Sequence, residues 1–110
     1  MKEHALQCQI VEYLRMKGYY CYAIPNGFYS GIKDKGKKFA YINKLKREGY
    51  LVGAPDLQVL LPKGKIIHLE LKVGYNKLSI HQEAFRDKCE ELGHKYHVIR
   101  SLEDVMELGL

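Results

Sequence analysis

One segment, residues 54–73, constrains the fold of this chain more than any other part of the sequence. A run of strand-forming residues, a turn and a second strand follow one another at residues 57–61, 62–64 and 65–73. If Leu61 and Lys65 flank a three-residue turn, the numbers of paired residues add to 126, which puts Asp56 opposite Glu70. Their Cβ atoms would then lie about 4.5–5.5 Å apart. The sequence therefore predicts a tight antiparallel hairpin that brings two carboxylates together.

The second strand of this hairpin alternates between two faces, which fixes the neighbours of Glu70. Ile67, Leu69, Leu71 and Val73 share one face, and His68, Glu70 and Lys72 share the other. Two facing carboxylates repel, so a fold tolerates them when a cation lies between them or one of them holds a proton. Mg²⁺ or Mn²⁺ accepts such oxygen ligands, and Lys72 is placed to hold an attacking water or to neutralise charge on a phosphate. The alternative is an exposed charged stripe, with Asp56 as a turn residue after Pro55.

Length and composition limit the kinds of protein that the chain can form. At 110 residues and 12.8 kDa, with 46% hydrophobic residues, a single domain spanning residues 1–110 is expected. No apolar stretch is long enough to span a bilayer and the first residues lack a signal-peptide pattern, so we expect a cytoplasmic protein without a membrane partner. Three cysteines without C-x-x-C and five histidines without H-E-x-x-H imply neither a disulfide framework nor zinc. No pattern indicates an organic cofactor.

The positive charge of the chain is concentrated in one segment. Residues 33–47 carry seven bases against the single acid Asp34, whereas the rest of the chain has eleven bases and twelve acids. The seven bases are Lys33, Lys35, Lys37, Lys38, Lys44, Lys46 and Arg47. Aromatic residues lie among and beside them, as on a surface that binds nucleic acid. The alternative is a solvated loop and helix face without a partner.

The remaining pattern predicts helices around a sheet. We expect a helix at residues 3–17, a strand at 19–24, a basic helix at 38–48, a helix from 79 to 92, a strand at 95–100 and a final helix after 101. The helix at 79–92 would turn Ala84, Phe85, Lys88, Cys89 and Leu92 inward. The order α-β-(α)-β-β-α-β-α favours an α/β fold with a mixed central sheet flanked by helices.

This order of elements and motifs resembles the restriction-endonuclease-like core of the PD-(D/E)xK nuclease superfamily. Within that superfamily, the chain looks like a stand-alone VRR-NUC domain, the virus-type replication and repair nuclease family. The matching stretches are Glu3 with Gln7, Pro25-Asn26-Gly27, Leu45-Lys46 with Gly49, Gly53-Ala54-Pro55-Asp56-Leu57, Glu70-Leu71-Lys72, Leu78-Ser79 with Gln82, and Gly93. They cover nearly the whole chain, and each is weak alone, but their order and spacing together are specific.

The resemblance implies metal-dependent hydrolysis of phosphodiester bonds, with Mg²⁺ or Mn²⁺ as the cofactor. Asp56 and Glu70 would be the metal-binding carboxylates, and the carbonyl of Leu71 would be a further ligand. Lys72 would position the water that attacks the phosphate.

Two more residues are implied in the site, and each has an alternative role. At about 100° per residue, Glu3 shares the apolar stripe of its helix and Glu12 points away, so Glu3 is the acid that this helix would add to the metal site. Glu3 could instead merely complement the helix dipole. Gln82 would approach the site from its own helix, although Ser79-x-x-Gln82 is also a capping box in which Gln is expected for local reasons.

The expected partner is DNA, recognised by its shape. The seven bases contact phosphate without reading sequence, Asn26 is taken as a further DNA contact, and no base-reading module is present. Stand-alone domains of this kind resemble Holliday-junction resolvases in forming homodimers, which implies branched DNA and a repair role in a bacterial or phage-infected cell. The terminal helix and the basic segment are candidate dimer interfaces. The alternatives are a non-catalytic nucleic-acid-binding module of the same fold, or a nuclease acting on flap, single-stranded or RNA substrates.

Overall fold

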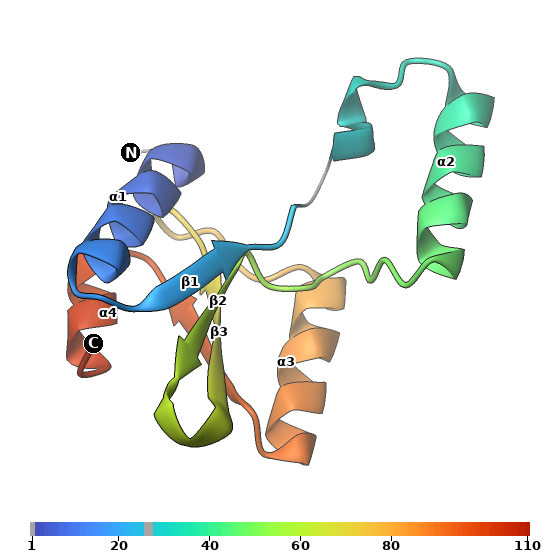
Figure 1. The fold of residues 1–110 in the computed structure, drawn as a ribbon. Coiled ribbons are helices and arrows are strands. Elements are labelled where there is room, and N and C mark those ends of the chain that lie inside the picture. Colours follow the sequence, from blue (N-terminus) through green and yellow to red (C-terminus); the bar gives the residue numbers. More distant parts are fainter. Residues whose placement is uncertain (1, 26–27) are drawn as a thin grey trace.

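A mixed sheet with helices on both faces forms the body of the molecule in the computed structural model, which describes residues 2–25 and 28–110 (Figure 1). Its helices are α1 (Glu3–Met16), α2 (Lys35–Arg47), α3 (Ile80–Leu92) and α4 (Leu102–Glu107), and its strands are β1 (Tyr20–Ala23), β2 (Leu57–Leu61), β3 (Lys65–Leu71) and β4 (Lys95–Ile99). Two short 3₁₀ turns are η1 (Phe28–Gly31) and η2 (Pro62–Gly64). Within the described ranges, no helix is both long and apolar enough to cross a membrane. The predicted α/β fold with a mixed central sheet is confirmed.

The four strands lie side by side in the order of the chain, β1-β2-β3-β4. β2 pairs antiparallel with both β1 and β3, whereas β4 runs parallel to β3 because α3 carries the chain back between them. Helices α1 and α4 cover one face of this sheet and α3 lies on the other (Figure 1).

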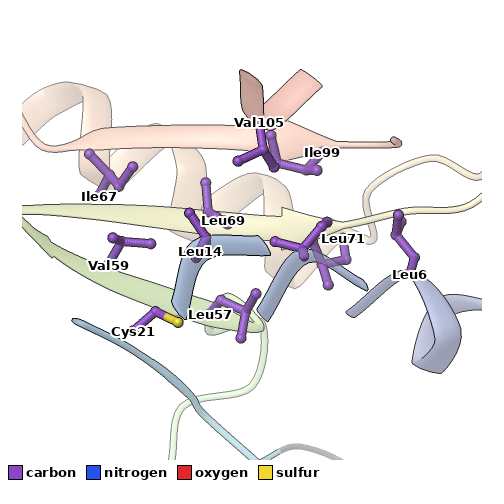
Figure 2. Packing of buried hydrophobic residues seen from close by; sticks show 11 residues of the cluster. Leu6, Leu14, Cys21, Leu57, Val59, Ile67, Leu69, Leu71, Ile99 and Val105 are labelled. Carbon is purple, nitrogen blue, oxygen red and sulfur yellow. The ribbon is translucent and has the colours of Figure 1, made fainter. Parts of the chain in front are cut away.

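The core lies between the sheet and the pair α1 and α4 (Figure 2). Helix α1 contributes Leu6, Ile10 and Leu14, which recur every four residues and therefore form one stripe. The buried residues of the whole core are Leu6, Ile10, Leu14, Cys21, Leu57, Val59, Ile67, Leu69, Leu71, Ile99 and Val105. Because alternate residues of β2 and β3 are committed to this core, the intervening side chains point to the α3 face.

The hairpin between β2 and β3 has the predicted register. Leu57 pairs with Leu69 and Leu61 pairs with Lys65, so paired numbers do add to 126. The turn closes because Lys63 and Gly64 both adopt positive φ, at 66° and 72°. The same register, continued one residue beyond Leu57, brings Asp56 opposite Glu70.

Helix α3 has the predicted ends and the predicted inward face, but that face is only partly covered. Ser79 and Gln82 form a complete capping box, and Gly93 ends the helix with φ of 82°. Of the expected inward residues only Cys89 is buried, while Ala84, Lys88 and Leu92 are exposed. All five do face inward as predicted, because they line an open groove of about 710 Å³ between α3 and the sheet, and this groove leaves most of them accessible to solvent.

Residues 28–50 form an arm that projects from the body (Figure 1). Helix α2 begins three residues before the predicted start because the side chain of Asp34 accepts the backbone N–H of Lys37 at 2.8 Å. None of its residues is buried. The arm explains why the radius of gyration is 15.1 Å, when about 13 Å is typical of a compact chain of this length.

Candidate active site

Asp56 lies where β2 begins and is held by both neighbouring strands. Its carbonyl oxygen accepts the N–H of Ile24 at 2.9 Å, next to β1. Its carboxylate Oδ2 accepts the N–H of Leu71 at 2.8 Å, at the end of β3. The carboxylate is thus fixed by the sheet and does not depend on a flexible loop.

Glu70 is the most unusual residue of the sheet because it has an ionisable side chain and yet is only 1% exposed. Gln82 Nε2 donates to its Oε2 at 3.3 Å, whereas Oε1 is buried without a hydrogen-bond partner in the described structure. Burial raises the pKa of Glu70 to about 9, and the neighbouring carboxyl group of Asp56 raises it further. The alternative of an exposed charged stripe is wrong for this residue.

The carbonyl of Leu71 lies on the same side of β3 as Asp56. The N–H and C=O groups of one strand residue point the same way, and the Leu71 N–H reaches Asp56. Two residues beyond the Leu57–Leu69 pair, the register puts Pro55 opposite Leu71. Proline has no N–H, so Pro55 cannot donate the usual sheet hydrogen bond to the carbonyl oxygen of Leu71. The proline before Asp56 therefore leaves a backbone oxygen available beside two carboxylates.

Lys72 and Glu3 complete the charged group. Lys72 is half-buried, its N–H donates to Ile99 O at 3.0 Å, and its charge acts to lower the pKa of both Glu70 and Glu3. Glu3 is exposed at the start of α1, and partial burial and the charge of Asp56 raise its pKa. Glu3 therefore faces the site, while Glu12 lines a different hollow.

Gln82 performs both of the roles that its position allows. Its side-chain Oε1 accepts the N–H of Ser79 at 2.9 Å, which closes the capping box, and its Nε2 donates to Glu70. The two ends of one amide therefore couple the start of α3 to the carboxylate on β3.

Glu3 and Asp56 line two adjoining hollows, of about 310 and 360 Å³. The larger continues past Gln7 to Pro25, and the smaller extends to Gln82. Asn26, expected to contact DNA, lies outside the described residues. Position 56 is thus reachable from solvent although Glu70 is buried behind it.

The oxygen atoms of this site fit a hard divalent cation. Asp56 and Glu70 supply two carboxylates, the Leu71 carbonyl is adjacent, and the buried Glu70 Oε1 has no partner. Among the described residues, no three His, Cys, Asp or Glu side chains are grouped closely enough to hold a metal on their own. Carboxylate and carbonyl oxygens are the kinds of ligand that hard divalent cations accept.

The base of the arm forms one wall of the smaller hollow. Tyr29 and Tyr50 lie at the two ends of the arm, and both line the hollow. Their ring centroids are 6.0 Å apart in an edge-on arrangement. Neither was predicted as a site residue, and no sequence signal links two tyrosines that are 21 positions apart. Lys38 lies over the Tyr29 ring at 5.8 Å, and the other six bases are exposed. The arm thus presents its cations beside the candidate site.

The raised pKa of Glu70 predicts a pH dependence of stability in metal-free protein. Because the folded-state pKa lies at about 9, above the ordinary 4.5, the folded protein binds more protons than the unfolded chain between these values. The free energy of unfolding attributable to Glu70 is therefore expected to fall as pH rises through this range. Glu70→Gln is expected to remove this loss.

Denaturant unfolding in EDTA at about pH 5, 7 and 9 measures the effect. His68 and His97, whose pKa values are lowered by burial, act in the opposite direction at acidic pH, so the difference between wild type and Glu70→Gln is the quantity of interest. Glu12→Gln serves as the exposed control. Equal pH slopes for wild type and Glu70→Gln would show that Glu70 is not held neutral.

Comparison with known proteins identifies the fold. No family model matches the sequence, and no match is found among curated proteins. Among solved structures, a chain described as a VRR_NUC domain matches with a TM-score of 0.67 and 24% identity, over 96% of this chain and 91% of the other. The chain therefore has the fold of a VRR_NUC domain, as its sequence motifs predict.

Proposed function

We propose that this protein is a divalent-metal-dependent endonuclease that hydrolyses phosphodiester bonds in branched DNA such as Holliday junctions. The observation that carries the proposal is the buried carboxyl group of Glu70, with one unpartnered oxygen, beside Asp56 and Lys72 at the end of the hairpin. A fold gains nothing in stability from burying a carboxyl oxygen that has no partner, so a ligand is the simplest reason to keep Glu70 there.

Asp56, Glu70 and the Leu71 carbonyl would hold Mg²⁺ or Mn²⁺, and Glu3, which lines the same two hollows as Asp56, would join through water. When bound, the ion supplies positive charge at the phosphate and lowers the pKa of a bound water. Lys72 holds the water that attacks phosphorus and offsets the negative charge that develops on the phosphate oxygens. The water oxygen would form the new bond to phosphorus and give up one proton to solvent, while the bond from phosphorus to the leaving oxygen breaks and that oxygen takes up a proton.

The arm and the two hollows support DNA as the substrate. The arm carries the excess positive charge of the chain, and none of the recorded ion pairs of the described residues involves its seven bases. Because such contacts read phosphate and not base sequence, the choice of substrate would depend on DNA shape. We propose a homodimer as the active form, since symmetric cleavage of a four-way junction needs two sites.

Incubation with labelled four-way, flap and linear DNA tests this function. Product is expected in Mg²⁺ or Mn²⁺, is expected to be absent in EDTA, and is expected to form faster on the four-way junction than on linear duplex. Cleavage of RNA or single strands alone would replace the proposed substrate, and binding without cleavage in either metal would indicate a non-catalytic module. Light scattering on the same preparation tests the dimer.

Removing cations from the arm is expected to weaken DNA binding without changing the metal site. In the triple variant Lys44→Gln, Lys46→Gln and Arg47→Gln, the last turn of α2 loses three exposed charges. The slope of log K against log salt is expected to become shallower by about 0.9 for each phosphate contact that is lost. Fluorescence anisotropy with labelled duplex, measured in EDTA at several salt concentrations, gives this slope.

A matched variant separates the position of the charge from its amount. Lys63→Gln, Lys65→Gln and Lys95→Gln remove the same number of exposed cations at the opposite end of the molecule, near the hairpin turn. This control is expected to change the salt slope less than the arm variant. Equal loss in both triple variants would mean that net charge, and not the arm, attracts DNA.

A further inference from the structure

Two buried side-chain polar atoms have no hydrogen-bond partner in the described part of the chain, Glu70 Oε1 and Tyr96 OH. Buried polar groups in folded proteins are nearly always paired, so each exception calls for a reason. One of these atoms is an acceptor and the other belongs to a donor. Their chemistry is therefore complementary.

Strand register brings the two residues to the same region. β3 and β4 pair in parallel, with His68 opposite Tyr96 and Glu70 opposite Val98. Tyr96 is therefore the diagonal neighbour of Glu70 on the same face of the sheet, the face that α3 covers. The Tyr96 ring packs against Phe85 of α3, with ring centroids 6.0 Å apart, which restrains the direction of its hydroxyl.

The phenol of Tyr96 remains a hydrogen-bond donor under all ordinary conditions. Burial raises its pKa well above the usual value, and the negative charges of Glu70 and Asp56 raise it further. The strand register, which makes Tyr96 the diagonal neighbour of Glu70, is consistent with this influence. A neutral donor beside a carboxylate also costs no extra charge burial.

We propose that Tyr96 is a positioning residue of the candidate metal site, whose hydroxyl donates to Glu70 Oε1, directly or through one bridging water, when the divalent ion is bound. Gln82 already donates to the other oxygen, Oε2. Each carboxylate oxygen has two lone pairs, so both hydrogen bonds leave electron pairs for the ion. The inference rests on the proposed function, because Glu70 is one of the residues that would hold the ion. Such outer contacts orient a ligand and typically change metal affinity by about 10–100-fold.

Tyr96→Phe removes only the hydroxyl and therefore tests the proposal. We expect unchanged or higher resistance to denaturant in EDTA, because a buried unpaired hydroxyl is lost. Calorimetric titration with Mn²⁺ is expected to show an affinity about tenfold lower than that of wild type. The Mn²⁺ concentration for half-maximal cleavage is expected to rise by a similar factor. Tyr20→Phe, on an exposed tyrosine of β1, is the matched control and is expected to change none of these quantities.

The possible outcomes separate this inference from the proposed function. Wild-type Mn²⁺ affinity in Tyr96→Phe would overturn the role of Tyr96 while leaving the nuclease intact. Lower stability in EDTA together with weaker Mn²⁺ binding would make Tyr96 a packing residue and would also overturn it. If wild type itself fails to bind Mn²⁺, the proposed function fails first.

Discussion

Asp56→Asn is expected to lower the rate of DNA cleavage by at least about a hundredfold while leaving the protein folded. Asn keeps an oxygen that can accept the Leu71 N–H, so the link between β2 and β3 survives. It removes the negative charge that a divalent ion requires, and it removes one of the causes that raise the pKa of buried Glu70 in the metal-free protein. Single-turnover cleavage and denaturant unfolding in EDTA, measured side by side, check both parts.

Matched substitutions locate this effect in the site. Asp87→Asn removes an exposed carboxylate of α3 and is expected to leave cleavage unchanged. Lys72→Ala is expected to abolish cleavage but to retain Mn²⁺ binding, whereas Lys65→Ala, on the exposed end of β3, is expected to change neither. Cleavage at the wild-type rate by Asp56→Asn would remove Asp56 from the catalytic group.

Gly53→Ala is expected to destabilise the protein by about 2–5 kcal/mol and to slow cleavage. A Cβ atom at this position would lie 2.4 Å from the carbonyl oxygen of His81, and φ of +95° disfavours any side chain. Because the contact is with backbone, relief requires the first turn of α3 to move. That movement would displace Gln82 from Glu70, so the site loosens along with the fold.

Gly49→Ala separates the effect of the clash with His81 from the effect of the positive φ. Gly49 has φ of +106°, similar to that of Gly53, but a Cβ there meets no atom within 4 Å. Gly49→Ala is expected to lower the free energy of unfolding only by the backbone penalty of about 1–2 kcal/mol, without a change in Mn²⁺ affinity. Denaturant unfolding and Mn²⁺ titration of both variants make the comparison. If Gly53→Ala costs no more than Gly49→Ala, close packing of α3 against residue 53 does not position the site.

Features set by neighbouring residues were predictable from the sequence. The Pro62–Gly64 turn fixes the register of the hairpin, and that register alone brings Asp56 opposite Glu70. The ends of α3 follow from the Ser79 capping box and from Gly93. The helical angle of Glu3 also placed it correctly, because the apolar stripe of α1 packs on the sheet.

Features that depend on contacts between distant segments were not predictable. The burial of Glu70 depends on α3 lying over the sheet, and the register of β4 beside β3 decides that Tyr96 is its neighbour. Tyr29 and Tyr50 are in contact only because the two ends of the arm, residues 28–50, come together at the body of the protein. The open groove beside α3 was missed for a related reason, since an amphipathic stripe indicates which side faces inward but not whether anything covers it.

Single-turnover cleavage of a labelled four-way junction, measured with Mn²⁺ and with EDTA on one protein preparation, tests metal-dependent hydrolysis most directly. Asp56→Asn is measured in parallel, after unfolding curves have shown that it is folded. The predicted result is a product that forms in Mn²⁺, that is absent in EDTA, and that Asp56→Asn fails to produce. A protein that binds the junction but leaves every strand intact in both Mn²⁺ and Mg²⁺ would contradict a catalytic role for the Asp56, Glu70 and Lys72 group.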